Sequence, residues 1–256
     1  MRVVYGVNPV RELLRAGGEG LAELWLSEGG TRGAAFAELE RLGREAGAKV
    51  RRAPRARLDR LAGGDRHQGV VAVVADYRYA GPDDVLAAAR ASGRPALVVV
   101  LDGVEDPHNL GAIIRSALAL GAHGVLIPRD RAVGVTAAAV KASAGAAERL
   151  PVARVTNVTK ALESLKEAGV WTVGLAASGD RTLADLDLGG PTALVLGSEG
   201  EGIRPLVLRT CDHVARIPMT GEIDSLSVSA SAAIALYEAA RQRGGTRPDS
   251  RVESSP

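Results

Sequence analysis

The sequence predicts an α/β protein whose larger part is a parallel sheet covered by helices on both faces. Between residues 96 and 243, uniformly apolar strands alternate with helical segments, as expected for strands that are buried on both faces. A shorter alternation of strands and helices occupies residues 4–76. Hydrophobic residues make up 46% of the 256 residues and aromatic residues only 3%, so the expected cores are aliphatic.

A small α/β domain is predicted over residues 1–76. Its first helix opens at Asn8-Pro9 and runs through Leu14, and Leu58 and Leu61 mark a short third helix. Between these two helices, apolar side chains recur at helical spacing and predict a second helix. That second helix covers residues 34–47, and the strands are residues 21–27, 48–52 and 69–77.

A linker is predicted over residues 77–95, because turn signals at Gly81-Pro82 and Gly93 flank a single polar-faced helix. The second domain follows, over residues 96–243. Its predicted strands are residues 96–104, 124–128, 151–155, 170–177, 192–198 and 213–219, and its predicted helices are residues 110–120, 135–146, 157–168, 202–211 and 227–242. Residues 244–256 are rich in Gly, Pro, Ser and Arg, so we expect a disordered tail.

Several classes of protein are disfavoured by composition. The single cysteine, Cys211, excludes an internal disulfide and a multi-cysteine zinc site, and we interpret it as a small buried hydrophobe. No cluster of metal ligands is expected. The chain shows no signal region and no apolar stretch of the roughly 20 residues needed to cross a bilayer, so we expect a cytoplasmic protein without a membrane partner.

Positive charge gathers in the first domain, where residues 1–75 hold 13 Lys and Arg against 9 Asp and Glu. The densest part lies on the second predicted strand and in the segment after it, and favours contact with an RNA phosphate backbone. A solvated surface is the alternative for the same pattern. The candidate RNA-binding residues are Lys49, Arg51, Arg52, Arg55 and Arg57.

A glycine-rich turn, Gly197 to Gly202, follows a buried strand and precedes a helix. This position corresponds to the ligand crevice at the carboxyl ends of parallel strands. The order G-x-x-G-x-G differs from the dinucleotide fingerprint, and no P-loop is present, so neither type of nucleotide site is expected. Glu199 is the one carboxylate expected at the crevice, and a tight turn that caps the next helix is the alternative.

The segment DPHNLGAIIRSA, residues 106–117, follows the first strand of the second domain. Asn109 is the expected N-cap, and Arg115 is expected to project near the face that carries the glycine turn. A guanidinium there could bind a phosphate or carboxylate through two hydrogen bonds, whereas a surface ion pair is the alternative. His108 beside Asp106 suggests an acid-base pair, with a structural turn histidine as the alternative.

Serines alternate from Ser225 to Ser231 at the start of the last helix. Ser225 is the expected N-cap or loop donor, and the others suit close helix packing. A serine hydrolase is not expected, because the nucleophile motif G-x-S-x-G is missing.

Three of these segments together resemble the motifs of the SpoU (TrmH-type) RNA ribose 2′-O-methyltransferases of the SPOUT superfamily. DPHNLGAIIRSA is similar to motif one, LVLGSEGEGI to motif two and IPMTGEIDSLSVSASAAIALYEA to motif three. VVYGVNPVRELL and HQGVVA resemble the ends of the small substrate-binding domain that precedes many members. The order of domains looks most like the RlmB-type subgroup, which modifies a guanosine of 23S rRNA.

The resemblance implies a trefoil-knotted methyltransferase domain, which is an exception to the rule that chains avoid threading. It implies S-adenosylmethionine as cofactor, structured RNA as substrate and a homodimer through the methyltransferase domain. The cofactor contacts that it implies are Leu196, Gly197, Gly202, Ile217, Met219 and Leu226. The catalytic residues that it implies are Asn109, Arg115, Glu199 and Ser225.

One position departs from the family pattern. Members commonly read S-L-N-V-S where this chain has Ser225-Leu226-Ser227-Val228-Ser229, so the amide that orients groups at position 227 is missing. Other functions therefore stay open: a 2′-O-methyltransferase that acts on tRNA or confers antibiotic resistance through rRNA, or a non-catalytic RNA-binding ribosome-assembly factor of the same fold.

Overall fold

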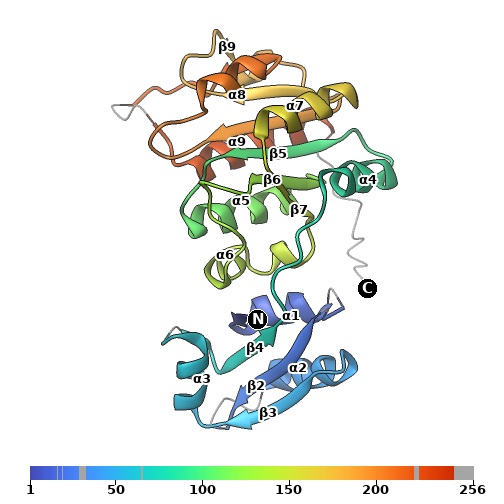
Figure 1. Cartoon of the computed structure of the whole chain (residues 1–256), viewed down its shortest axis with the longest axis vertical. Coiled ribbons are helices and arrows are strands. Elements are labelled where there is room, and N and C mark those ends of the chain that lie inside the picture. The colour runs from blue at the N-terminus through green and yellow to red at the C-terminus, as the bar shows by residue number, and fades with distance from the viewer. Residues whose placement is uncertain (16, 19, 29–32, 65, 222–224, 245–256) are drawn as a thin grey trace, which may run out of the picture.

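Two separate sheets organise the computed structural model, which describes residues 1–15, 17–18, 20–28, 33–64, 66–221 and 225–244. Figure 1 shows the smaller sheet and its helices at one end of the molecule and the larger sheet at the other. This arrangement agrees with the predicted α/β fold, in which a small domain precedes a larger one. The exact domain boundaries stay predictions.

The smaller sheet has the strand order β1-β4-β2-β3. Its strands are β1 (Arg2–Tyr5), β2 (Leu21–Ser27), β3 (Lys49–Ala53) and β4 (Val70–Val74), and its helices are α1 (Val7–Arg15), α2 (Ala34–Glu45) and α3 (Arg55–Ala62). Only β2 and β3 run parallel; β4 is antiparallel to both of its neighbours. Strand β1 was missed by the sequence analysis, because four residues carry too little periodicity and the strand depends on pairing with β4.

Residues 67–69 join three elements of this domain. The backbone N–H of Val7, at the start of α1, donates to Gln68 Oε1 at 3.0 Å. The buried His67 accepts from Gly69 N through Nδ1 at 3.0 Å, so its Nε2 donates to Asp59 of α3 at 2.8 Å. The two sequence signatures of this domain, one at each of its ends, therefore meet in space.

The larger sheet has seven strands in the order β7-β6-β5-β10-β8-β11-β9, and every pair is parallel, as predicted. The strands are β5 (Leu97–Asp102), β6 (Gly124–Pro128), β7 (Val152–Val155), β8 (Trp171–Leu175), β9 (Arg181–Thr182), β10 (Thr192–Gly197) and β11 (His213–Arg216). The short strand β9 was not predicted. The trefoil knot stays a prediction.

Helices cover both faces of this sheet, because alternate residues of its buried strands point to opposite sides. Val99 belongs to the core beneath α5, α6 and α9, and its neighbour Val98 to the core beneath α4, α7 and α8. The helices are α4 (Pro82–Ser92), α5 (Pro107–Ala119), α6 (Ala137–Ala142), α7 (Val158–Glu167), α8 (Pro205–Thr210) and α9 (Val228–Gln242), with short 3-10 turns η1 (Ala146–Glu148) and η2 (Leu183–Asp185).

Three boundaries differ from the prediction. Helix α4 is not part of a free linker: Val85 is buried against the sheet, and Ala80 N donates to Val152 O at 3.0 Å. Helix α6 is shorter than the predicted 135–146, and β11 ends at Arg216 before the expected 219. The predicted disordered tail lies, from residue 245 on, outside the described residues.

Arg243 secures the end of α9 against the large sheet. Its guanidinium donates to the carbonyl oxygens of Leu188 and Pro95 at 2.9 Å and to that of Ala96 at 3.1 Å. Burial lowers the pKa of this guanidinium to about 10, so it remains protonated at neutral pH.

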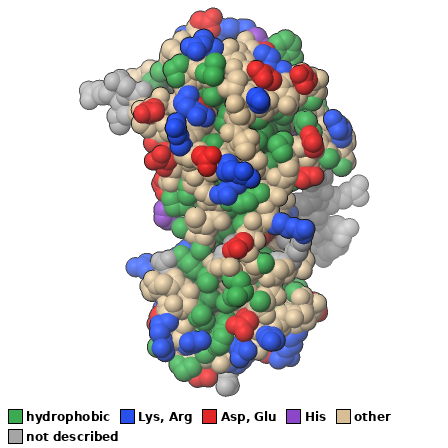
Figure 2. Space-filling view, viewed as in Figure 1, with side chains coloured by type: hydrophobic (Ala, Val, Ile, Leu, Met, Phe, Trp, Pro, Cys, Tyr) green, Lys and Arg blue, Asp and Glu red, His purple; other side chains and the backbone are tan. Residues whose placement is uncertain are grey.

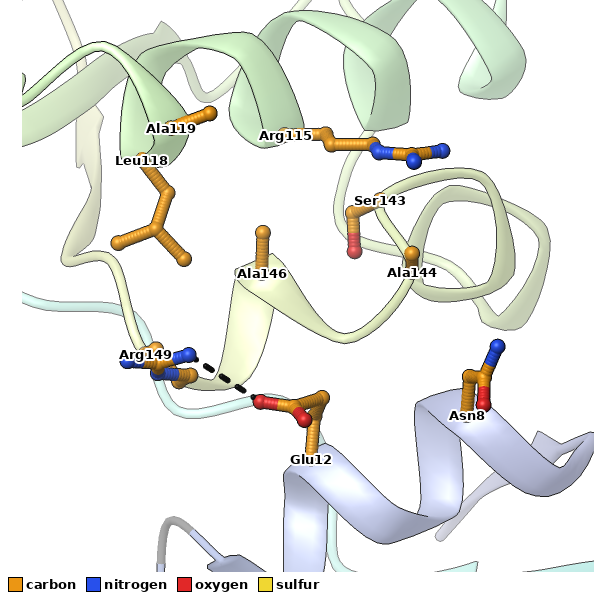
Figure 3. Close-up of a pocket in the computed structure, with 9 residues that line it drawn as sticks. All are labelled: Asn8, Glu12, Arg115, Leu118, Ala119, Ser143, Ala144, Ala146 and Arg149. Carbon is orange, nitrogen blue, oxygen red and sulfur yellow. Dashed lines mark hydrogen bonds and ion pairs between the residues drawn. The ribbon is translucent and has the colours of Figure 1, made fainter. Parts of the chain in front are cut away.

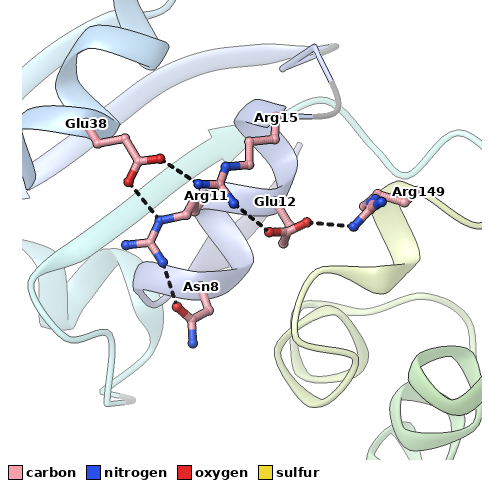
Figure 4. A network of polar contacts seen from close by, with 6 residues as sticks. All are labelled: Asn8, Arg11, Glu12, Arg15, Glu38 and Arg149. Atoms are coloured by element: carbon pink, nitrogen blue, oxygen red, sulfur yellow. Dashed lines mark hydrogen bonds and ion pairs between the residues drawn. The ribbon is translucent and has the colours of Figure 1, made fainter. Parts of the chain in front are cut away.

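A polar network joins the two parts of the chain (Figure 4). Glu12 of α1 pairs with Arg149 at 3.2 Å across the junction, and Arg15 joins Glu12 to Glu38. A side chain at Gly145 would place its Cβ 2.3 Å from Glu12 Cβ, so glycine permits this close approach. Charged and small residues therefore meet at the junction, beside the apolar cluster that both parts share.

Acidification is expected to destabilise the fold through His123. This side chain is 6% exposed; its Nδ1 accepts from Leu97 N at 3.0 Å, and its Nε2 lies 2.8 Å from Ser92 Oγ. Burial is the main cause that lowers the pKa of His123. The folded state thus binds fewer protons than the unfolded state, so stability should fall as the pH drops below the ordinary histidine pKa of about 6.5. The loss is about 1.4 kcal/mol for each unit by which the pKa of His123 differs between the unfolded and the folded state.

The melting temperature at pH 5 and pH 8 measures this effect in the native protein and in His123→Gln. The native protein should lose more stability at pH 5 than the variant, which has no imidazole to protonate. Equal losses in both proteins would mean that His123 does not contribute.

Candidate active site

A cavity of about 460 Å³ opens where the carboxyl ends of β8, β10 and β11 meet. It is lined by segments that follow these three strands and by the start of α9. Its lining residues are Leu175, Ala176, Ala177, Ser178, Leu196, Gly197, Ser198, Glu199, Glu201, Gly202, Ile203, Leu208, Ile217, Met219, Ser225, Leu226, Val228 and Ser231.

All six predicted cofactor contacts line this cavity, and so do the predicted catalytic residues Glu199 and Ser225. The residues that the sequence analysis missed come mainly from 175–178, after β8. Nothing in the local pattern of that segment indicates a site. Its role depends on β8 lying next to β10, which only the strand order reveals.

The glycine turn has a fixed shape. Ser198 and Gly202 exchange backbone hydrogen bonds at 3.1 Å, and Gly202 has a φ of 69°. A Cβ on Gly197 would lie 1.8 Å from the carbonyl carbon of Gly202, so no other residue fits without a shift of the backbone. The turn leads into α8, whose N-cap Arg204 makes no side-chain cap hydrogen bond.

A buried carboxylate anchors the far side of this turn. Asp102, at the end of β5, is 1% exposed and accepts hydrogen bonds from the backbone N–H and the Nε of Arg204, both at 2.9 Å. This contact raises the pKa of the Arg204 guanidinium. Residues 197–204 are therefore held at both ends of the turn.

A chain of hydrogen bonds connects motif one to the glycine turn and to α9. Asn109 Nδ2 donates to Glu199 Oε1 at 2.8 Å, and Ser229 Oγ donates to Asn109 Oδ1 at 2.8 Å. Ser227 Oγ lies 3.2 Å from Ser229 Oγ. Both ends of the Asn109 amide are thus used, which fixes its orientation beside the cavity. Ser229 was missed as a site residue, although the alternation of serines pointed to this segment.

Two predicted helix caps are wrong. Asp106 caps α5, because its Oδ1 accepts from His108 N at 2.9 Å. The carboxylate therefore bonds a backbone group, which does not support an acid-base pair with the imidazole. Ser227 caps α9 by accepting from Ala230 N at 3.2 Å, which leaves Ser225 in the cavity wall.

Arg115 does not line this cavity, which differs from its expected position near the glycine turn. Six residues separate it from Asn109, which turns its side chain about 120° around the helix. It lies instead in a second cavity of about 460 Å³ between α5, the turn after α6 and α1 (Figure 3). Asn8 and Glu12 of the small domain lie on the opposite wall.

The other polar candidates differ in their surroundings. Burial raises the pKa of the Cys211 thiol to about 12, and its Sγ contacts Val207 O at 3.4 Å, which agrees with an unreactive packing role. Within the described ranges, no group of three or more His, Cys, Asp or Glu residues could hold a metal ion. The helices of the same ranges include none with the length and apolar character of a membrane span.

The predicted RNA-binding residues all lie on or just after β3, the edge strand of the small sheet. Several pair with carboxylates: Arg51 with Glu23 at 3.2 Å, Arg52 with Glu40 at 2.6 Å and Arg55 with Asp59 at 4.0 Å. Three of the five residues are thus engaged in surface ion pairs.

Comparison with known proteins identifies the family. Residues 96–237 match the SpoU rRNA methylase family model. The chain belongs to this family. In this SpoU protein, residues 3–80 match the RNA 2′-O ribose methyltransferase substrate-binding domain. This range contains the smaller sheet. A Mycolicibacterium vanbaalenii protein named as a tRNA/rRNA methyltransferase is 47% identical over 94% of this chain and 76% of its own length.

Solved structures of SpoU proteins have the same fold. The SpoU methyltransferase AviRb from Streptomyces viridochromogenes, in complex with AdoMet, superposes with a TM-score of 0.80 at 31% identity over 96% of this chain and 91% of its own. The AdoMet-bound rRNA methyltransferase from Sinorhizobium meliloti gives 0.78 at 26% identity, over 94% and 87%. The expected family and α/β fold are confirmed.

Proposed function

We propose that this SpoU-family protein transfers a methyl group from S-adenosylmethionine to a ribose 2′-hydroxyl of RNA, at a guanosine of 23S rRNA as in the RlmB-type subgroup. The observation that carries this proposal is the cavity at the carboxyl ends of β8, β10 and β11, which is lined by the fixed glycine turn and by Glu199, the hydrogen-bond partner of Asn109.

The cavity suits an adenosyl group. Its volume of about 460 Å³ falls within the usual range for small-molecule sites, about 300–1,000 Å³. Apolar side chains such as Ile217 and Leu226 provide surfaces for a purine, and the missing Cβ of Gly197 lets the backbone of Gly202 pack against it to form the wall of the cavity. S-adenosylmethionine supplies a methyl group already activated by a positive sulfur, so no metal is required.

The protein's own residues then position the ribose. Asn109, Glu199 and Ser225 orient the sugar so that its 2′-oxygen lies in line with the methyl carbon. The oxygen bonds to that carbon as the carbon–sulfur bond breaks, the electron pair stays on sulfur, and the hydroxyl proton passes to an RNA phosphate or to water. Ser227 takes part through Ser229, which partly replaces the amide that other members carry at this position.

Arg115 anchors a phosphate of the same RNA strand. Its guanidinium is exposed in the second cavity, and a guanidinium keeps its proton in proteins, which makes it a poor base. Because this cavity is separate from the one that holds the glycine turn, we assign Arg115 to the phosphate and not to the 2′-oxygen.

The protein works as a homodimer in the cytoplasm, and its small domain holds structured RNA. Two large side chains on α9 are exposed, Ile234 by 41% and Tyr237 by 60%, and we expect them to lie in the dimer interface. Helix α9 packs beside α5. The trefoil knot of this family would place α9 next to the cofactor loops.

Mapping of 2′-O-methyl groups in rRNA and tRNA, from cells with and without the gene, tests the function. We expect one 23S rRNA guanosine to lose its methyl group when the gene is removed. Loss at a tRNA position instead would reassign the substrate. An unchanged map, together with no calorimetric binding of S-adenosylmethionine, would favour an assembly factor and contradict the enzyme.

A further inference from the structure

One face of the small sheet carries two arginines on a single tryptophan. Trp25 of β2 lies opposite Arg51 of β3 in the register of the sheet. The guanidinium carbon of Arg51 is 5.3 Å from the centre of the Trp25 ring, and that of Arg57, from α3, is 5.5 Å from it. Trp25 thus contacts two cations, one from β3 and one from α3.

A carboxylate fixes the tryptophan and one of the two arginines. The Nε1–H of Trp25 donates to Glu23 Oε2 at 3.0 Å, and the other oxygen of Glu23 lies 3.2 Å from Arg51. The ring also packs against the apolar cluster of Leu58 and Val71. The indole therefore has a set orientation, and the guanidinium groups on it are held before any ligand arrives.

The positive charge at this cluster exceeds the negative charge. In the described part of the chain, Glu23 is the one carboxylate in contact with it, whereas Arg51, Arg57 and the exposed Lys49 each carry a positive charge. Among the residues that the structure describes, neither Arg57 nor Lys49 forms an ion pair with a carboxylate. Figure 2 shows a band of hydrophobic side chains across this domain with Lys and Arg side chains along its margins.

The neighbouring arginines have other roles. Arg52 follows Arg51 on β3, so its side chain points to the opposite face of the sheet. There it pairs with Glu40 of α2 at 2.6 Å, and this hydrogen bond lowers the pKa of the Glu40 carboxyl. Arg55 faces Asp59, which also accepts from His67. The basic cluster of the sequence is thus divided between two faces.

We infer that Trp25, Arg51 and Arg57 form a clamp for the RNA backbone, in which the two guanidinium groups bind phosphate and the indole packs against the adjoining nucleotide. Guanidinium groups bind phosphate oxygens through paired hydrogen bonds, and stacking on a tryptophan fixes their planes. The clamp rests on the proposed function, because it names the part of the small domain that holds the substrate.

Binding of the full-length protein to a transcribed 23S rRNA fragment tests the clamp at several salt concentrations. Arg57→Ala should weaken binding about tenfold and reduce the slope of log affinity against log salt by about 1, because one phosphate contact is lost. Trp25→Leu keeps an apolar side chain and should weaken binding about threefold to tenfold, as expected for loss of stacking. Arg41→Ala is the matched control, because Arg41 lies on α2 and pairs with Glu45 at 2.6 Å. It should bind RNA within about twofold of the native protein.

Calorimetric binding of S-adenosylmethionine and the melting temperature confirm that each variant is folded. Native affinity and salt slope in Arg57→Ala and Trp25→Leu would overturn the clamp, and so would an equal loss in Arg41→Ala. If the variants bind RNA like the native protein, and the native protein methylates RNA, the clamp is wrong and the proposed function stands. Loss of affinity in the variants of a protein that methylates no RNA would contradict the function and support the clamp.

Discussion

Replacement of Gly197 by alanine is expected to weaken the binding of S-adenosylmethionine strongly. The new Cβ would lie 1.8 Å from the carbonyl carbon of Gly202 and 2.1 Å from Ile203 N, and both are backbone atoms that no rotamer change can move. The turn would have to open, which removes the wall of the cavity. Overpacking costs about 1–3 kcal/mol or more, so calorimetry should show a loss of affinity of about 100-fold.

Gly200→Ala is the matched control for this prediction. It adds the same methyl group to the same turn, but its Cβ would meet nothing within 4 Å. We expect it to bind the cofactor within about threefold of the native protein, given that surface substitutions usually change stability by no more than about 0.5 kcal/mol. Native affinity in Gly197→Ala would show that the cofactor does not bind against this turn.

Replacement of Arg115 by lysine or alanine is expected to lower kcat/KM for RNA by about 100-fold or more, the usual effect of losing a donor to a developing or fixed anion. Lysine keeps the charge but lacks the planar pair of donors that grips a phosphate. Affinity for S-adenosylmethionine should not change, because Arg115 lies outside the cavity of the glycine turn. Methyl transfer to RNA and calorimetry measure the two quantities separately.

Arg149→Lys provides the control, since Arg149 lines the same cavity but pairs with Glu12. Its turnover should stay within a fewfold of the native value. If Arg115→Lys also retained near-native turnover, paired hydrogen bonds to phosphate would not be needed, and the role assigned to Arg115 would be wrong.

Predictions from local pattern succeeded where the relevant contacts are close in the chain. Gly197 was singled out because a glycine turn after a buried strand is a local feature, and its missing Cβ does prove necessary. The caps of α5 and α9 were each misplaced by a few residues, since Asp, Asn and Ser are all good N-caps and the helix register alone chooses among them.

Arg115 and Arg52 show what local sequence pattern cannot predict. The sequence indicated that both are exposed cations, but not which element covers the surface around them. Arg115 faces α1 of the small domain, and Arg52 faces Glu40 of α2. Both outcomes depend on contacts between segments that are distant in the chain, which periodicity does not encode.

The sequence alone determined the alternation of apolar strands and helices. It thereby determined the parallel sheet, because strands that are buried on both faces must be apolar throughout. The tertiary structure alone decided the order β5-β10-β8-β11. That order sets 175–178 beside the glycine turn and brings Ser229 to Asn109, 120 residues away in the chain. Strand neighbours in a parallel sheet are chosen by the path of the crossovers and the packing of the whole core, so no single segment specifies the site.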